Sequence, residues 1–191
     1  MIRDYGFFRI IHGNIAEFRG GAIVVPCFSD LTPAPEISDA VRTKLSRDGY
    51  KTDIFGNIEK NLGELFTSEF YPFELPFVKG LVMARCYVDR QDSNEKSKDM
   101  IYYLKTAKTA ESALSVARKN DLDSIAFPVL MAGRSGGSLG EIVPAMIDEI
   151  SRAREDFSKI EIYALNKEVF REFVSIADVK LREHFFELDN L

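Results

Sequence analysis

The sequence contains no tryptophan, and it has only two histidines and two cysteines among 191 residues. No histidine or cysteine stands at ligand spacing from Cys27 or Cys86, so the sequence predicts no metal centre. Both cysteines lie in apolar, strand-like segments, which is typical of reduced, buried thiols in a cytosolic protein. We therefore expect a cytoplasmic protein that carries no metal and no cofactor.

Long apolar runs are also missing. None approaches the roughly 18 residues of a membrane-spanning helix, and the first four residues already carry charges, unlike a secretory signal. The composition, with 46% hydrophobic and 29% charged residues, is typical of a soluble globular protein with no membrane association. A net charge of -5 gives no general attraction to a phosphate backbone, so nucleic acid is not the expected partner.

What the chain does contain is an alternation of strand-like and helix-like segments. Strands are predicted at 7–11, 22–27, 77–88, 124–130 and 159–165, and helices at 36–47, 100–119, 138–154 and 167–175. This order favours an α/β sandwich with a mixed sheet. The length fits one domain over residues 1–191. Glycines, prolines and aromatics predict an irregular excursion with short elements at about 48–76. Gly80 predicts a break or bulge in the strand 77–88, and the tail after 176 receives no assignment.

The segment "LMAGRSGGSLGE" (130–141) places three close glycines between a strand and a helix. Ser138 and Glu141 have the spacing of a capping box, which predicts a helix start at Ser138. A glycine-rich turn before a helix exposes main-chain N–H groups in the positive end of the helix dipole, and phosphate is the natural guest. Such turns are also plain connectors, and the spacing matches neither a P-loop nor a dinucleotide fingerprint. The pattern alone does not decide whether this loop binds an anion.

Two stretches together resemble the macro domain family. "HGNIAEFRGGAIVVPC" (12–27) is similar to the family's G-D-I opening and its strand D-A-I-V-N-A-A-N, and "SIAFPVLMAGRSGGSLGEIVPAMIDEI" (124–150) to its S-I-A-F-P strand, phosphate loop and helix. Weaker likeness at 63–87 and 159–173 extends the resemblance over about 7–175. The resemblance implies a three-layer α/β/α fold that binds ADP-ribose in a cleft at the carboxyl ends of the strands. A fainter similarity, in "AIVVPCFSDLTPA", is to the amino-terminal domain of leucine aminopeptidases.

The resemblance also implies a set of ligand-binding residues. Asn14 and Ile15 would face the adenine, where the Asn14 amide oxygen could replace the family's aspartate as acceptor. Asn166 would lie at the same end, and the loop would hold the diphosphate and distal ribose. The other ligand-binding residues that the resemblance implies are Cys27 and Phe28 at the end of the strand. In the loop and its flanks they are Ala132, Gly133, Arg134, Ser135, Gly136, Gly137 and Ser138.

Two departures from the family keep its catalytic activity an open question. Val25, Pro26, Cys27 and Phe28 replace N-A-A-N, and "SDLTPAPEISD" (29–39) replaces the G-G-G-V loop. Asp30 and Asp39 are the acid candidates in this region, and Asp30 is the better of the two, but neither has an assigned catalytic role. Three functions therefore stay open: a module that binds ADP-ribose or a related nucleotide, with ADP-ribosylated protein as a further partner; a hydrolase of ADP-ribosyl or phosphate esters; and a degenerate domain used for protein contacts.

Overall fold

The computed structural model describes residues 1–27, 32–49, 55, 68–72, 77–86, 95–132 and 137–188, with the side chains of 95–99 and 183–188 excepted. Its strands are β1 (Ile2–Asp4), β2 (Arg9–His12), β3 (Gly20–Cys27), β4 (Ser68–Pro72), β5 (Val78–Arg85), β6 (Ser124–Pro128) and β7 (Lys159–Ala164). They form one seven-stranded sheet in the order β1-β2-β7-β6-β3-β5-β4. The five inner strands run parallel to one another, and the two edge strands, β1 and β4, pair antiparallel. The predicted mixed sheet is confirmed.

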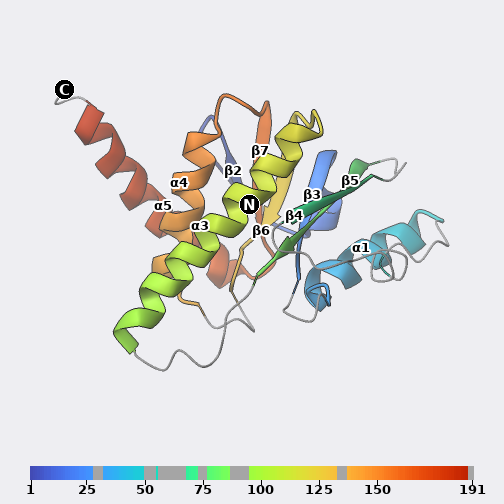
Figure 1. Ribbon diagram of the computed structural model, residues 1–191, viewed down its shortest axis with the longest axis horizontal. Coiled ribbons are helices and arrows are strands. Elements are labelled where there is room, and N and C mark those ends of the chain that lie inside the picture. The colour runs from blue at the N-terminus through green and yellow to red at the C-terminus, as the bar shows by residue number, and fades with distance from the viewer. Residues whose placement is uncertain are drawn as a thin grey trace.

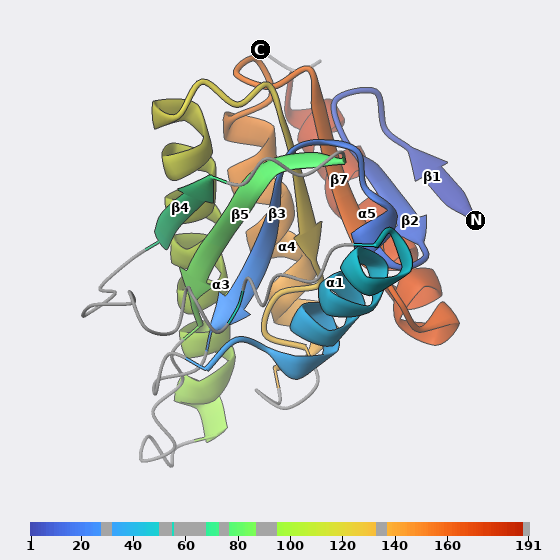
Figure 2. The ribbon, with the colours of Figure 1, turned by 90° about the vertical axis from the view of Figure 1, so that its right-hand side faces the viewer.

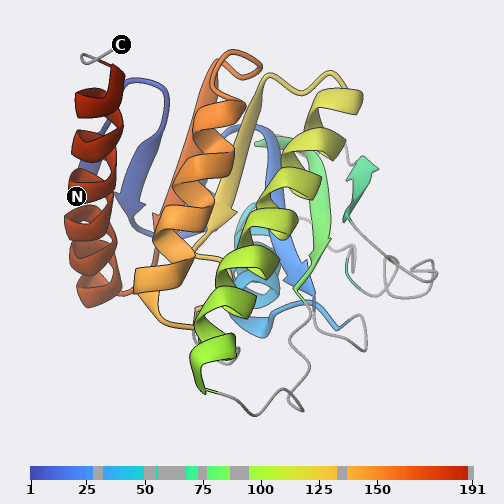
Figure 3. The same ribbon diagram turned by 60° about the vertical axis from the view of Figure 1, so that its left-hand side comes forward.

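Helices cover both faces of this sheet (Figure 1). The helical segments are the short 3-10 turn η1 (Ile15–Glu17) and the helices α1 (Pro35–Arg47), α3 (Glu95–Lys119), α4 (Leu139–Arg152) and α5 (Lys167–Leu188). Figure 2 shows α1 in front of the sheet, and Figure 3 shows α3, α4 and α5 side by side on the opposite face. The expected three-layer α/β/α architecture is therefore confirmed. Among the described helices, none is long and apolar enough to cross a bilayer.

The inner strand β3 is apolar throughout because each of its faces meets a separate core. Successive side chains of a strand point to opposite faces. Ala22 and Val24 accordingly join the core formed with α3, α4 and α5, whereas Ile23 and Val25 join the core beneath α1. All four side chains are fully buried. The continuous apolar sequence is thus the consequence of helices on both sides of a parallel sheet.

Gly80 does not break its strand. β5 stays in register through this residue, which pairs with Ala22 of β3 on one side and with Pro72 of β4 on the other. A Cβ atom at this position would lie 2.3 Å from the carbonyl oxygen of Tyr71 and 2.5 Å from the ring of Phe70. The glycine is required by this close approach, so the expected break or bulge is wrong.

The sequence prediction missed two strands and the end of one helix. β1 is only three residues long, and β4 lies inside the stretch expected to be irregular, so neither offers a long alternating pattern. Helix α5 was expected to end near residue 175, but it continues to Leu188. Four side chains explain the extension, because their spacing places them on one buried stripe of the helix: Phe170, Phe173, Ala177 and Leu181.

Candidate functional site

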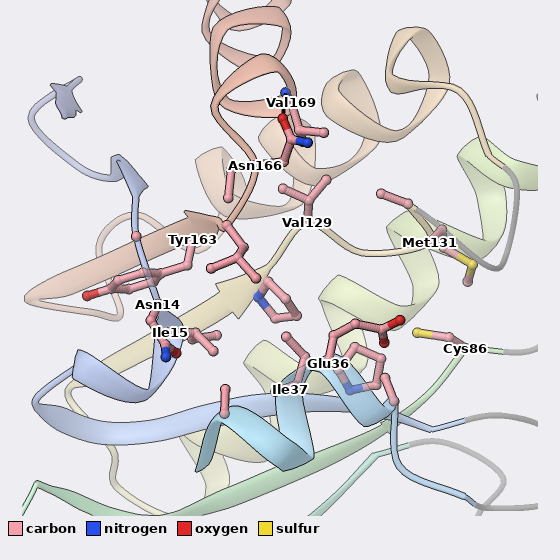
Figure 4. Close-up of a pocket in the computed structure, with 18 of the residues that line it drawn as sticks. Asn14, Ile15, Glu36, Ile37, Cys86, Val129, Met131, Tyr163, Asn166 and Val169 are labelled. Carbon is pink, nitrogen blue, oxygen red and sulfur yellow. Dashed lines mark hydrogen bonds between the residues drawn. The ribbon is translucent and has the colours of Figure 1, made fainter. Parts of the chain in front are cut away.

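A cavity of about 250 Å³ opens at the carboxyl ends of the parallel strands (Figure 4). The strand ends contribute Pro26 and Cys27 of β3, Pro128 of β6, and Tyr163 and Ala164 of β7. In open α/β sheets this edge is where ligands bind, because the connecting loops and helix starts surround it. The cavity at this edge is therefore the candidate functional site.

Several helix starts also line the cavity. Asn14 and Ile15 come from the start of η1, Glu36 from the start of α1, and Asn166 and Val169 from the start of α5. The amino end of an α-helix carries partial positive charge, so the starts of α1 and α5 favour electron-rich ligand groups. No lysine, arginine or histidine belongs to the described lining, and main-chain dipoles provide its positive potential.

Asn14 serves as the N-cap of η1. Its side-chain oxygen accepts a hydrogen bond of 2.9 Å from the amide of Ala16. The oxygen that was expected to receive the adenine amino group is therefore already bonded, with one lone pair left. Within the described part of the chain, the side-chain NH₂ of Asn14 makes no hydrogen bond. Asn14 thus offers the cavity a donor more readily than an acceptor.

Asn166 plays the same part for α5. Its side-chain oxygen accepts hydrogen bonds from the amides of Glu168, at 2.7 Å, and Val169, at 3.3 Å. This satisfies two of the amides that a helix start leaves without partners. The NH₂ group of Asn166 has no hydrogen bond to any described residue. Two asparagine caps therefore bring two NH₂ donors to one cavity.

The chain reverses direction just after β6, at Met131. This residue has φ of 58°, in the left-handed region, and its carbonyl oxygen accepts a hydrogen bond of 3.4 Å from the amide of Gly137. Such a backbone conformation is unfavourable for a residue with a side chain and concentrates at functional sites. The bond joins the two ends of the predicted phosphate loop and uses the Gly137 amide internally. Met131 and Ala132 line the cavity, whereas Gly137 and Ser138 do not.

Helix α4 begins without the predicted capping box. Ser138 occupies the N-cap position, as expected, but makes no side-chain cap bond. Ser138 is exposed, so water can bond its hydroxyl. One carboxylate oxygen of Glu141 is buried and has no hydrogen-bond partner in the described structure. The amides of Leu139 and Gly140 likewise lack a partner among the described residues. The main-chain amides at the amino end of α4 therefore have no side-chain cap.

Tyr163 forms the aromatic part of the cavity wall. Its hydroxyl donates a hydrogen bond of 2.9 Å to Glu161, and both residues are buried. Burial, followed by the hydrogen bond to the nearby carboxylate, raises the pKa of Tyr163 above its usual value of about 10. The phenol therefore stays protonated, and its bond to Glu161 fixes the ring at the cavity.

Both cysteines of the chain lie against the cavity. Cys27 and Cys86 are buried and not joined by a disulfide. Burial raises the pKa of the Cys86 thiol to about 12, although a hydrogen bond with Thr109 opposes this effect. A thiol in this state is a poor nucleophile, which agrees with the structural role expected for the cysteines.

The sequence prediction placed five residues that do line the cavity, namely Asn14, Ile15, Cys27, Ala132 and Asn166. It missed Glu36, Cys86 and Tyr163, although each stands at the end of a predicted strand or at the start of a predicted helix. Outside the described residues lie Phe28, Asp30, Gly133, Arg134, Ser135 and Gly136.

Asp39, on helix α1, gives no sign of a second site. Its side chain is 70% exposed and pairs with Arg42 at 3.3 Å, as a solvated surface carboxylate does. In the described part of the chain, no group of three or more histidine, cysteine, aspartate or glutamate residues could hold a metal ion.

Comparisons with known proteins agree on the fold. No family model matches the sequence, and no curated protein matches it. Solved macrodomain structures do match, at low identity. The Trypanosoma brucei macrodomain in complex with ADP superposes with a TM-score of 0.70 at 15% identity, over 89% of this chain and 68% of that one. The macro domain of ganglioside induced differentiation associated protein 2 has a TM-score of 0.66 at 15% identity, over 87% and 82%.

A third structure is a variant of the Oceanobacillus iheyensis macrodomain with ADPR. Its TM-score is 0.62 at 14% identity, over 97% of this chain and 98% of that one. The chain therefore has the macrodomain fold across nearly its whole length.

Proposed function

We propose that the protein binds ADP-ribose or a related nucleoside diphosphate in the cavity at the carboxyl edge of the sheet. One observation carries the proposal: the starts of α1 and α5 converge on a single cavity with Met131 and Ala132, which follow β6. The partial positive charge at these helix starts suits a phosphate-bearing ligand.

The cavity size decides which part of the ligand it holds. Pockets that bury a whole drug-sized ligand measure about 300–1,000 Å³, and this one measures about 250 Å³. It therefore suits a nucleoside, between the apolar side chains of Ile15, Tyr163 and Val169. The diphosphate would then extend past Met131 toward the uncapped start of α4, where the amides of Leu139 and Gly140 offer hydrogen bonds.

The two asparagine caps supply the polar contacts for the base. Their oxygens are bonded to the main chain, so the NH₂ groups of Asn14 and Asn166 are the donors that remain for ring nitrogens or ribose oxygens. The structural neighbours support this reading, because two of those described above were solved with ADP or ADPR. Leu165 belongs to the lining and is 68% exposed, so the cavity meets solvent on this side.

Titration calorimetry with ADP-ribose, ADP, AMP and NAD tests the proposal. Val169→Phe would project a larger side chain from the start of α5 into the cavity, and we expect it to weaken binding at least tenfold. Val179→Phe is the matched control, because Val179 is 57% exposed on the same helix and does not line the cavity. The absence of binding to the unmodified protein at millimolar ligand would overturn the proposal.

A further inference from the structure

The two asparagines of the cavity lie at the ends of neighbouring strands. The Gly13 amide donates a hydrogen bond of 3.1 Å to the carbonyl oxygen of Ala164, which joins the end of β2 to the end of β7. Asn14 directly follows Gly13, and Asn166 stands two residues after Ala164. Both asparagines line the same cavity (Figure 4). Two carboxamides therefore border the proposed nucleoside site.

Hydrogen bonds to the main chain fix the orientation of both carboxamides. A backbone amide only donates, so the side-chain atom that it bonds must be the oxygen rather than the NH₂ group. The amide of Ala16 bonds the Asn14 oxygen in this way, and the amides of Glu168 and Val169 bond the Asn166 oxygen. The NH₂ group is thus the end of each side chain that stays available.

The hydrogen-bonding positions that remain on the two asparagines are nearly all donors. Two carboxamides have four N–H bonds and four oxygen lone pairs between them. Main-chain amides occupy both lone pairs of Asn166 and one lone pair of Asn14. Neither NH₂ group has a hydrogen bond to any described residue, so four N–H donors stand against one free lone pair.

The other oxygen-bearing side chains of the described lining, Glu36 and Tyr163, do not change this balance. The Tyr163 hydroxyl is directed to Glu161, which does not line the cavity. Figure 4 shows Glu36 on the side of Cys86, away from Asn14, and its side chain already interacts with another group of the chain. The polar side-chain groups beside β2 and β7 are therefore the two NH₂ groups.

Purine bases differ at the edge that such donors would contact. Guanine presents two neighbouring acceptors, the O6 carbonyl and N7, and hypoxanthine shares both. Adenine presents N7 beside an amino group that only donates. An amino group placed against an NH₂ group leaves two donors without an acceptor, whereas a carbonyl oxygen satisfies the donor that faces it. The available groups of the asparagines thus complement a 6-oxopurine better than adenine.

We propose that the cavity selects nucleoside diphosphates with a 6-oxopurine base over those with adenine, and that Asn14 and Asn166 determine this specificity through their NH₂ groups. The inference rests on the proposed function. It makes ADP-ribose a weaker ligand than the corresponding compound with hypoxanthine or guanine. Neutral hydrogen-bond donors set the preference, so the preference is insensitive to salt.

Titration calorimetry with IDP and ADP measures the preference directly. The two nucleotides carry the same ribose and diphosphate and differ at the edge of the base that includes position 6. We expect the wild type to bind IDP about tenfold more tightly than ADP, because the adenine amino group leaves donors unpaired at a partly exposed site.

Asn14→Asp tests the role of the NH₂ group. An aspartate oxygen accepts the same bond from Ala16, but the second oxygen of the carboxylate is an acceptor where asparagine has a donor. We expect the ratio of the IDP affinity to the ADP affinity to fall about fivefold. The added charge cancels in this ratio, since both ligands carry the same diphosphate.

Asn120→Asp is the matched control. Asn120 is exposed just past the end of α3 and does not line the cavity, so the same chemical change there leaves the ratio within about twofold of wild type. The wild-type ratio decides the inference even if Asn14→Asp does not fold, and urea denaturation shows whether it does.

Equal affinity of the wild type for IDP and ADP, or a preference for ADP, overturns the inference and leaves the proposed function standing. A preference for IDP that a folded Asn14→Asp variant retains in full overturns the role of Asn14. If the wild type binds neither IDP, ADP nor ADP-ribose at millimolar concentration, the proposed function and the inference fail together.

Discussion

Two substitutions of Asn166 distinguish its effect on the stability of α5 from its effect on ligand binding. The side-chain oxygen of this residue accepts two amide hydrogen bonds at the helix start, and Asn166→Ala removes both. Loss of an N-cap lowers the free energy of unfolding by about 1 kcal/mol, within a range of roughly 0.5–2 kcal/mol. Because Asn166 is exposed and water can replace part of the loss, we expect no more than about 1 kcal/mol.

Asn166→Asp provides the contrast. A carboxylate keeps the acceptor and adds a favourable interaction with the helix dipole of about 0.3–1 kcal/mol. It also adds a negative charge to the cavity lining, so we expect weaker binding of ADP-ribose at unchanged or increased stability. Asn166→Ala should show the opposite stability change, together with the loss of one NH₂ donor.

Urea denaturation measures the stability difference. With a slope of about 2 kcal/mol per molar urea, Asn166→Ala lowers the midpoint by about 0.5 M and Asn166→Asp does not lower it. The corresponding thermal midpoint of Asn166→Ala falls by about 2–4 °C for a protein of this size. The capping argument is refuted if Asn166→Ala retains the wild-type midpoint, or if both variants lose stability equally.

Three further predictions concern the surroundings of the cavity. At Gly137, a Cβ atom would lie 2.8 Å from the ring of Tyr102, so Gly137→Ala should lower the free energy of unfolding by about 1–3 kcal/mol in urea titrations. Adding Tyr102→Ala should recover part of that loss, and no recovery would contradict the clash. For Tyr163, the raised pKa means that the neutral phenol stabilises the fold below pH 10 and that this contribution is lost as pH rises further. Tyr163→Phe should therefore flatten the decline of stability above pH 10. Near neutral pH the same substitution should lower the free energy of unfolding by about 1–3 kcal/mol, because the buried Glu161 loses its donor. A decline above pH 10 as steep as in the wild type would count against this assignment. Finally, the Cys86 thiol has a pKa of about 12, so it should be unreactive in the native protein at pH 8. In Cys27→Ala, where Cys86 is the remaining cysteine, a thiol reagent followed by absorbance should label it only after unfolding. Rapid labelling of the native variant would contradict this prediction and show that the thiol is accessible.

The sequence predicted the layers of the fold because its long apolar segments have clear periods. The apolar run of β3 and the stripe of α4 are each decided by burial, and both lie within a few residues of the expected bounds. The three-residue strand β1 has too little pattern to detect, since only its pairing with β2 makes it a strand. Short edge elements depend on their neighbours more than on their own residues.

The candidate site was predictable only in part, for a related reason. The resemblance to the macro domain family implied the positions of Asn14 and Asn166, each of which lies just past a predicted strand. The contribution of Tyr163 does not follow, because a tyrosine at the end of a buried strand could face either layer. Similarly, the direction of Glu36 depends on how α1 packs on the sheet. The bond between Met131 and Gly137 required left-handed backbone at a methionine, which no residue preference indicates.

The pairing of β2 with β7 has a consequence for synthesis of the protein. Gly13, just after β2, donates its amide to the carbonyl of Ala164 at 3.1 Å, and both residues face the cavity. One wall of the cavity thus joins two residues that lie far apart in the sequence, and the earlier of them leaves the ribosome long before the later one. A nascent chain that lacks β7 has no complete cavity, so nucleotide binding would report that translation has passed this strand. A ligand that stabilises the finished protein therefore gives no help to the incomplete chain.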